Sequence, residues 1–125
     1  MQNFYLKASK STPEITLNPN TGLLTFIGRS THEDPVVFYE PVIQWLKEYS
    51  KQPAPQTTLH INIDYFNTES SKCLLNVLKI IQHLSQTGNS ITVKWEYEMD
   101  DDDMNEAGQD FSAIVKLPFQ FIESN

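Results

Sequence analysis

Three hydroxyl side chains, Thr68, Ser70 and Ser71, lie close together where an expected strand meets an expected helix. Residues 59–65 alternate apolar and polar side chains as a half-buried strand does, and residues 69–85 repeat apolar side chains at helical spacing. The first turn of a helix carries unpaired backbone N–H groups and the positive end of the helix dipole, so it favours negative charge. The segment therefore has the chemistry of a phosphate-acceptor site.

Several roles are open to this junction. Lys72, one turn beyond Thr68, could contact a phosphate added there. The simpler interpretation is that Asn67 or Thr68 only caps the helix. The helix start at Thr68–Ser71 could also bind a nucleotide or another anionic small molecule.

Catalysis by these hydroxyl groups is a further hypothesis, and the sequence argues against it. Thr68 or Ser70 could act as a nucleophile with His60 as its base only if folding brought them together. His60 stands eight residues before Thr68 on an extended strand, which carries it well away at roughly 3.3 Å per residue. The chain has four glycines and neither a Gly-x-Ser-x-Gly elbow nor a phosphate-binding glycine loop, so we expect no catalytic residues and no cofactor.

The segment Tyr-Phe-Asn-Thr-Glu-Ser-Ser-Lys at residues 65–72 resembles the signature of the SiaC family of regulatory phosphoproteins, small bacterial proteins with a STAS-like fold. The similarity extends along the chain in order. The other matching segments are Gly28-Arg29-Ser30, Glu33-Asp34, Phe38-Tyr39, Trp45-Leu46, Trp95-Glu96-Tyr97-Glu98, the acidic run, Gly108, Asp110-Phe111 and Leu117-Pro118-Phe119.

This resemblance implies a non-enzymatic signalling protein with Thr68 as its phosphorylated residue. It implies a Ser/Thr kinase and a phosphatase that control Thr68, and a diguanylate cyclase, in c-di-GMP signalling of biofilm formation, that the unmodified form binds and activates. The candidate partner-binding residues are Asn67, Thr68, Glu69, Ser70, Ser71 and Lys72.

Composition limits the classes of partner and compartment. The 125 residues are expected to form one domain, 1–125, with a net charge of −7. The nine Lys and Arg are scattered along the sequence and predict no basic patch, which argues against nucleic-acid binding and membrane association. A single cysteine, Cys73, the lack of a signal peptide and the lack of a membrane-length apolar stretch predict a cytoplasmic protein.

Two polar clusters could be taken for metal sites. The run Asp100–Asp103 fits no EF-hand register, so we interpret it as a solvated acidic start to a helix. His60, Asn62 and Asp64 share one face of their strand, but no second cluster of ligands accompanies them. A polar, solvent-facing sheet surface explains this row, and we expect no metal site.

The expected architecture is an α/β, two-layer, STAS-like mixed β-sheet with helices packed mainly on one face. A hairpin is expected from strands 15–17 and 23–27, with Gly28 ending the second strand. Helices are expected at 35–49, bent near Val37 because Pro41 clashes with the preceding turn, at 69–85, and more weakly around 104–111. Alternating residues 91–97 and an edge segment at 117–121 complete the sheet, and such alternation requires one wet face.

Overall fold

The computed structural model describes residues 1–125 and contains six strands and three helices. The elements in chain order are β1 (Phe4–Leu6), β2 (Glu14–Leu17), β3 (Leu23–Ser30), α1 (Pro35–Tyr49), β4 (Gln56–Phe66), α2 (Thr68–Gln86), β5 (Ser90–Glu98), α3 (Asp102–Val115) and β6 (Phe119–Ser124).

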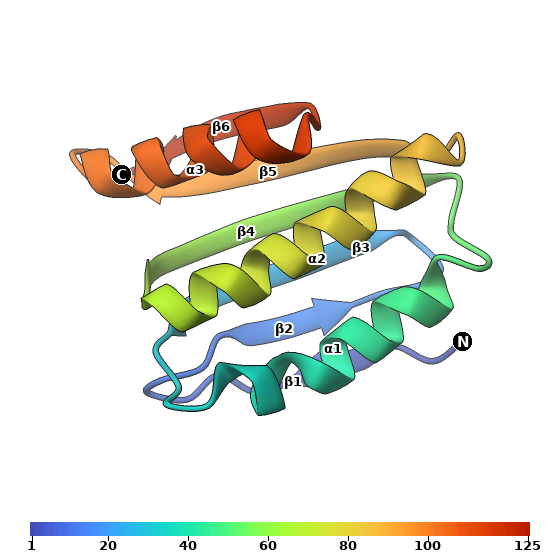
Figure 1. Ribbon diagram of the computed structural model, residues 1–125, viewed down its shortest axis with the longest axis horizontal. Helices are drawn as coiled ribbons and strands as arrows, with labels where there is room; N and C mark the ends of the chain where they lie inside the picture. The colour runs from blue at the N-terminus through green and yellow to red at the C-terminus, as the bar shows by residue number, and fades with distance from the viewer.

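All six strands form one mixed sheet whose spatial order follows the sequence, from β1 at one edge to β6 at the other. β1, β2 and β3 pair antiparallel, and β3, β4, β5 and β6 pair parallel. Each parallel crossover contains one helix, so the three helices begin at the edge where the parallel strands end (Figure 1). This end of the sheet, where β3, β4 and β5 finish and the helices begin, is called the switch edge below; it is not one of the two edge strands.

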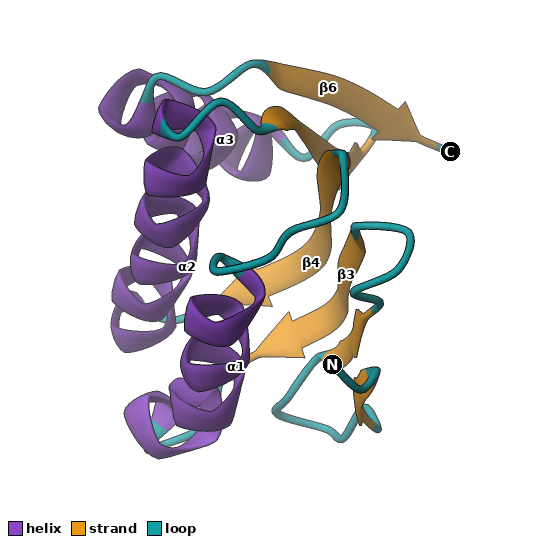
Figure 2. Ribbon diagram, turned by 90° about the vertical axis from the view of Figure 1, so that its right-hand side faces the viewer, coloured by secondary structure: helices purple, strands orange, loops and turns teal.

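The helices form a single layer on one face of the sheet, with α2 between α1 and α3 (Figures 1 and 2). The expected two-layer fold is confirmed. The apolar stripe of α2 (Cys73, Leu74, Val77, Leu78, Ile81 and Leu84) is buried in the same core as Ile61, Ile63, Val93 and Trp95 of β4 and β5. Two periodicities in the sequence, 3.6 for the helix and 2 for the strands, thus meet in one core.

The expected hairpin forms between β2 and β3, but β3 does not end at Gly28. Gly28 has a φ of 131°, a conformation that side-chain-bearing residues rarely adopt, and the strand continues to Ser30. The pairing of β3 with β4 shifts at this point, because Ile63 pairs with Gly28 and Tyr65 with Arg29, leaving Asp64 as an extra residue. This bulge exposes both Asp64 and Tyr65 and returns Phe66 to the core.

The first helix begins as the sequence predicts. Asp34 accepts a hydrogen bond from the backbone N–H of Val37 at 3.4 Å, and Pro35 occupies the first turn. The helix continues through Pro41. Tyr39 is 1% exposed and lies in the core.

Glycine in α3 has a packing role. The helix starts at the acidic run, where Asp101 accepts a hydrogen bond from the N–H of Met104 at 3.0 Å. A Cβ atom on Gly108 would stand 2.5 Å from Nε1 of Trp95 and 2.8 Å from the ring of Phe121. Glycine therefore lets α3 lie directly on Trp95, whose indole N–H donates to the carbonyl of Met104 at 2.9 Å.

The opposite face of the sheet carries no helix, and polar side chains of neighbouring strands pair across it. His60 contacts Glu96 with 2.8 Å between Nε2 and Oε1, and Asp64 contacts Arg29 at 3.5 Å. Two of the three residues in the row, His60 and Asp64, therefore contact side chains of adjacent strands. No group of three or more His, Cys, Asp or Glu side chains is arranged to hold a metal ion.

Leu78, fully buried at the centre of α2, provides a test of this packing. Leu78→Ala should lower the free energy of unfolding by roughly 2–5 kcal/mol, because it leaves a cavity between α2 and the sheet. Asn76→Ala, on the exposed side of the same helix, should change it by less than about 0.5 kcal/mol. Urea denaturation measures both values, and equal effects for the two variants would contradict the packing of α2 described above.

Candidate functional site

Asn67 is the residue that caps α2. Its backbone is extended, and its side-chain oxygen accepts a hydrogen bond from the N–H of Ser70 at 2.9 Å. Its carbonyl accepts a hydrogen bond from the N–H of Ser71 at 3.0 Å, and its own N–H donates to the carbonyl of Ser30 at 3.1 Å. Of the two capping residues that the sequence allowed, the structure selects Asn67.

Thr68 follows the cap as the first residue of α2, with an exposed side chain and no hydrogen bond from its hydroxyl to the protein. The hydroxyl of Ser71 is occupied by comparison, because it donates to the carbonyl of Thr68 at 2.7 Å. A phosphate on Thr68 would lie beside the unpaired N–H groups of the first turn without displacing an internal contact. Thr68 is thus the one hydroxyl of the segment that is both accessible and free.

Ser70 lies inside the protein, which corrects the expectation that it belongs to the partner-binding surface. It is 0% exposed, and its Oγ accepts a hydrogen bond from Ser30 Oγ at 2.9 Å. Ser30 Oγ also lies 2.8 Å from the hydroxyl of Tyr39. These three side chains, called the buried hydroxyl network below, connect the first turn of α2 to the end of β3 and to α1.

Acidic groups surround the start of α2. Lys72 pairs with Glu69 at 3.2 Å, so the cation closest to Thr68 along α2 already has a carboxylate partner. Burial raises the pKa of the Cys73 thiol, and the negative charges of Glu69 and Asp34 raise this pKa further. The thiol therefore stays protonated, and the start of α1 contributes its carboxylate to the same region.

A shallow acidic cleft of about 230 Å³ lies between the end of β4 and the start of α3, at the same switch edge. Its walls include Asp64, Asp101 and Asp103, together with Tyr65, Phe66, Met104 and Ala107. A phosphate on Thr68 would add roughly 1.5–2 negative charges to an edge that is already acidic.

The geometry separates the groups that a hydrolase would need. His60 lies on the open face of the sheet and contacts Glu96, whereas Ser70 lies beneath α2 on the opposite face. The structure brings neither Thr68 nor Ser70 to His60. The alternative hypothesis of an anion-binding site also finds no enclosing cleft, because none of the three clefts in the molecule is lined by residues 68–71.

Ser30 and Tyr39 are functional neighbours that sequence reasoning missed. Ser30 contacts Ser70 from 40 positions earlier in the chain, and Tyr39 joins the network through Ser30, so no local periodicity reveals these contacts. The position of Ser30 could have predicted a buried partner. Ser30 lies on the core-facing side of β3, where an unpaired hydroxyl would be costly.

Capping by Asn67 predicts different effects at two adjacent residues. Asn67→Ala should lower the free energy of unfolding by about 1 kcal/mol, because the N–H of Ser70 loses its acceptor. Thr68→Ala should change it by less than about 0.5 kcal/mol, because no internal hydrogen bond is removed. Urea denaturation of both variants decides the point, and a larger loss for Thr68→Ala would identify Thr68 as the cap instead.

The buried hydroxyl network predicts sensitivity to alkaline pH. Burial raises the pKa of Tyr39 from 10.0 to about 12, although its hydrogen bond with Ser30 acts in the opposite direction. Because the unfolded chain loses this proton at lower pH than the folded protein does, Tyr39 contributes stability that is complete below pH 10 and disappears as pH rises towards 12.

Chemical denaturation between pH 9 and 12 tests whether the stability falls with rising pH in this way. We expect the free energy of unfolding of Tyr39→Phe to fall less steeply with pH than that of the unsubstituted protein. Tyr65→Phe, at an exposed tyrosine, serves as the control. Parallel curves for Tyr39→Phe and the unsubstituted protein would show that Tyr39 does not ionise differently in the two states.

Comparison with known proteins shows that this fold occurs in solved structures. Three solved structures, each 22% identical in sequence, share the fold over nearly their whole length. Apo-SiaC from Pseudomonas aeruginosa superposes with a TM-score of 0.88, covering 98% of this chain and 99% of that one. A second SiaC structure from that organism has a TM-score of 0.89 over 99% and 100% of the two chains.

The third structure is a complex. It contains the diguanylate cyclase SiaD of Pseudomonas aeruginosa with its activator SiaC, and it matches with a TM-score of 0.91 over 97% of this chain and 99% of that one. An uncharacterised protein of Pseudomonas aeruginosa (strain UCBPP-PA14) is 24% identical over 119 residues, which are 95% of this chain and 94% of that protein. The model of the SiaC family of regulatory phosphoproteins matches residues 6–124. The chain therefore belongs to the SiaC family of regulatory phosphoproteins.

Proposed function

We propose that this protein is a non-enzymatic signalling switch whose single domain, residues 1–125, binds a partner enzyme according to the phosphorylation state of Thr68. The observation that carries the proposal is the state of the Thr68 hydroxyl. It is exposed and unbonded at the start of a 19-residue helix, whereas Ser70 is buried and Ser71 is bonded to the backbone. A kinase can reach Thr68 without unfolding the helix.

The proposed partner is a diguanylate cyclase. This choice rests on membership of the family and on the complex of the Pseudomonas aeruginosa relative with the cyclase that it activates. Here the partner surface comprises the exposed residues Thr68, Glu69 and Lys72 of the helix start, with the half-buried Asn67 and Ser71 beside them. A Ser/Thr kinase and a phosphatase would set the state of Thr68, and the unmodified form would be the one that binds and activates the cyclase.

Charge gives the switch its direction. At the start of α2 a phosphate is favourable for the helix itself, so modification leaves the fold in place. At an interface the same phosphate is hydrated and bulky, and it adds to the carboxylates of Glu69 and Asp64 on this edge. Screening limits the repulsion to about 8–10 Å, so it acts on partner groups that directly face Thr68.

Nucleotide binding at residues 68–71 was the alternative hypothesis, and the structure offers no observation in its favour. Asn67 already occupies the N–H groups of Ser70 and Ser71, and no cleft opens at the helix start. A helix N-terminus without an enclosing wall provides few contacts for a small molecule. None of the helices is long and apolar enough to cross a membrane, and we propose a cytoplasmic location.

Titration of a diguanylate cyclase from the same organism tests the proposal. We expect the unmodified protein and Thr68→Ala to bind with similar affinity, the phosphorylated protein to bind at least about tenfold more weakly, and Thr68→Glu to fall between them. Thr21→Glu is the matched control, because it places the same charge on an exposed threonine at the opposite edge of the sheet.

Two outcomes would contradict different parts of the proposal. Equal affinity of the unmodified, phosphorylated and Thr68→Glu proteins would remove Thr68 as the switch. Failure of the unmodified protein to bind any cyclase of the organism would overturn the assigned partner. Mass mapping of the protein from its native cells identifies the acceptor directly, and a phosphate found only on Ser71 would reassign it.

A further inference from the structure

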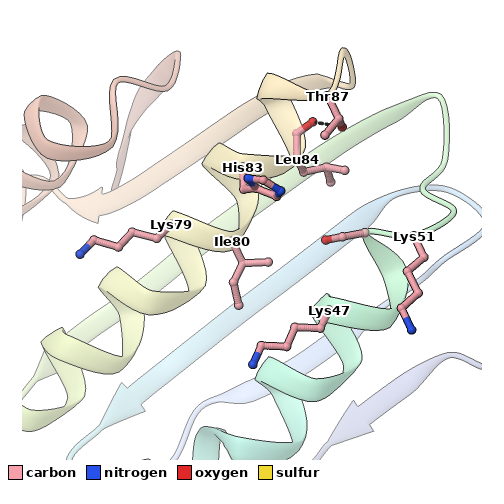
Figure 3. A pocket seen from close by; sticks show the side chains of 8 residues that line it. Lys47, Lys51, Lys79, Ile80, His83, Leu84 and Thr87 are labelled. Atoms are coloured by element: carbon pink, nitrogen blue, oxygen red, sulfur yellow. Dashed lines mark hydrogen bonds between the residues drawn. The ribbon is translucent and has the colours of Figure 1, made fainter.

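The largest cleft of the molecule lies far from the switch edge, between the C-terminal parts of α1 and α2 (Figure 3). Its volume is about 480 Å³. The residues that line it are Lys47, Ser50, Lys51, Lys79, Ile80, His83, Leu84 and Thr87. It is called the basic cleft below.

Three of the nine Lys and Arg residues of this acidic chain line the basic cleft, and they come from α1, the turn that follows it and α2. The expectation that basic residues stay scattered is therefore wrong at this position. Lys51 pairs with Glu48 at 3.0 Å, whereas Lys47 and Lys79 form no salt bridge. The sequence concealed the cluster because folding joins residues 47–51 to residues 79–87.

Helix dipoles explain only part of this arrangement. Lys47 and His83 stand in the last turns of α1 and α2, where positive charge stabilises a helix C-terminus. Lys79 stands seven residues before the end of α2 at Gln86, beyond the reach of that effect. Ile80 is only partly buried between the two helices, which leaves apolar surface beside the ammonium groups.

The arrangement of donors identifies the class of ligand. Helix C-termini present carbonyl groups and no free N–H groups, so the cleft lacks the backbone donors that hold a compact phosphate. The three ammonium groups are spread along the cleft and do not converge on one point (Figure 3). A peptide segment with several carboxylates spaced along it and an apolar side chain matches this pattern of charge and apolar surface.

We propose that the basic cleft docks an acidic segment of a protein partner. An apolar side chain of that segment would cover Ile80, and its carboxylates would face Lys47, Lys51 and Lys79. From Thr68 to Lys79 the helix rises about 16 Å, which exceeds the screening length of about 8–10 Å. Docking here is therefore independent of phosphate at Thr68 and does not rest on the function proposed above.

A designed peptide provides the probe. It is a helical peptide of about 14 residues with two leucines one turn apart and four flanking glutamates, and its counterpart carries glutamine in place of each glutamate. Titration into ¹⁵N-labelled protein at low salt should shift the amide signals of residues 46–52 and 79–87. We expect the glutamine peptide to bind at least about tenfold more weakly than the glutamate peptide. Added salt should lower the affinity for the glutamate peptide.

Two double variants of equal charge give the matched control. The double variant Lys47→Glu with Lys79→Glu should lower the affinity for the glutamate peptide at least about tenfold. The double variant Lys7→Glu with Lys10→Glu should change this affinity less than about twofold. All four lysines are exposed, and the amide spectra report whether each variant is folded.

Each of three results would overturn the proposal. The first is no shift at millimolar peptide, and the second is equal weakening by both double variants. The third is binding of GTP or inorganic phosphate at residues 46–52 and 79–87 in preference to the peptide, which would assign the cleft to a small anion.

Discussion

Three buried hydroxyl groups fix the start of α2, and the geometry of the switch edge depends on them. Ser70 in the first turn accepts a hydrogen bond from Ser30 at the end of β3, and Ser30 also contacts Tyr39 of α1. An unsatisfied hydroxyl at such a site would cost about 1–3 kcal/mol, so the three groups favour one arrangement of helix and strand. Because Ser70 points inward and Asn67 holds the cap, Thr68 is left facing solvent.

The helical layer separates charge along its length. The parallel strands and their crossovers place all three helix starts at one edge, where Asp34 and Asp101 cap helices and Glu69 stands beside Thr68. The opposite ends of α1 and α2 carry the lysines of the basic cleft. A phosphorylated threonine and an acidic docking segment would thus act at opposite ends of α2, too far apart for direct electrostatic competition.

Periodicity in the sequence was sufficient to predict β4, α2 and β5 and the wet face of the sheet, since each element repeats apolar residues with its own period. Periodicity could not predict contacts between segments that are distant in the sequence. Burial of Ser70 depends on Ser30, the basic cleft joins two helices, and Gly108 is needed because Trp95 lies against it.

Gly28 appeared to end β3 because its lack of a side chain suggests a break, yet here it permits a positive φ within the strand. The residues that pattern and resemblance identified at residues 67–72 lie together at the helix start, except for the side chain of Ser70.

Amide hydrogen exchange of the unmodified and Thr68-phosphorylated proteins tests most directly whether the switch is a change of surface charge on an unchanged fold. We expect amides of α2 from Leu74 to Leu84 to keep their protection after phosphorylation, since these residues stay packed on the sheet. Changes should be confined to residues 67–72 and the adjoining loops of the switch edge. Loss of protection along the whole of α2 would contradict this account, because it would show that phosphate at Thr68 releases the helix from the sheet.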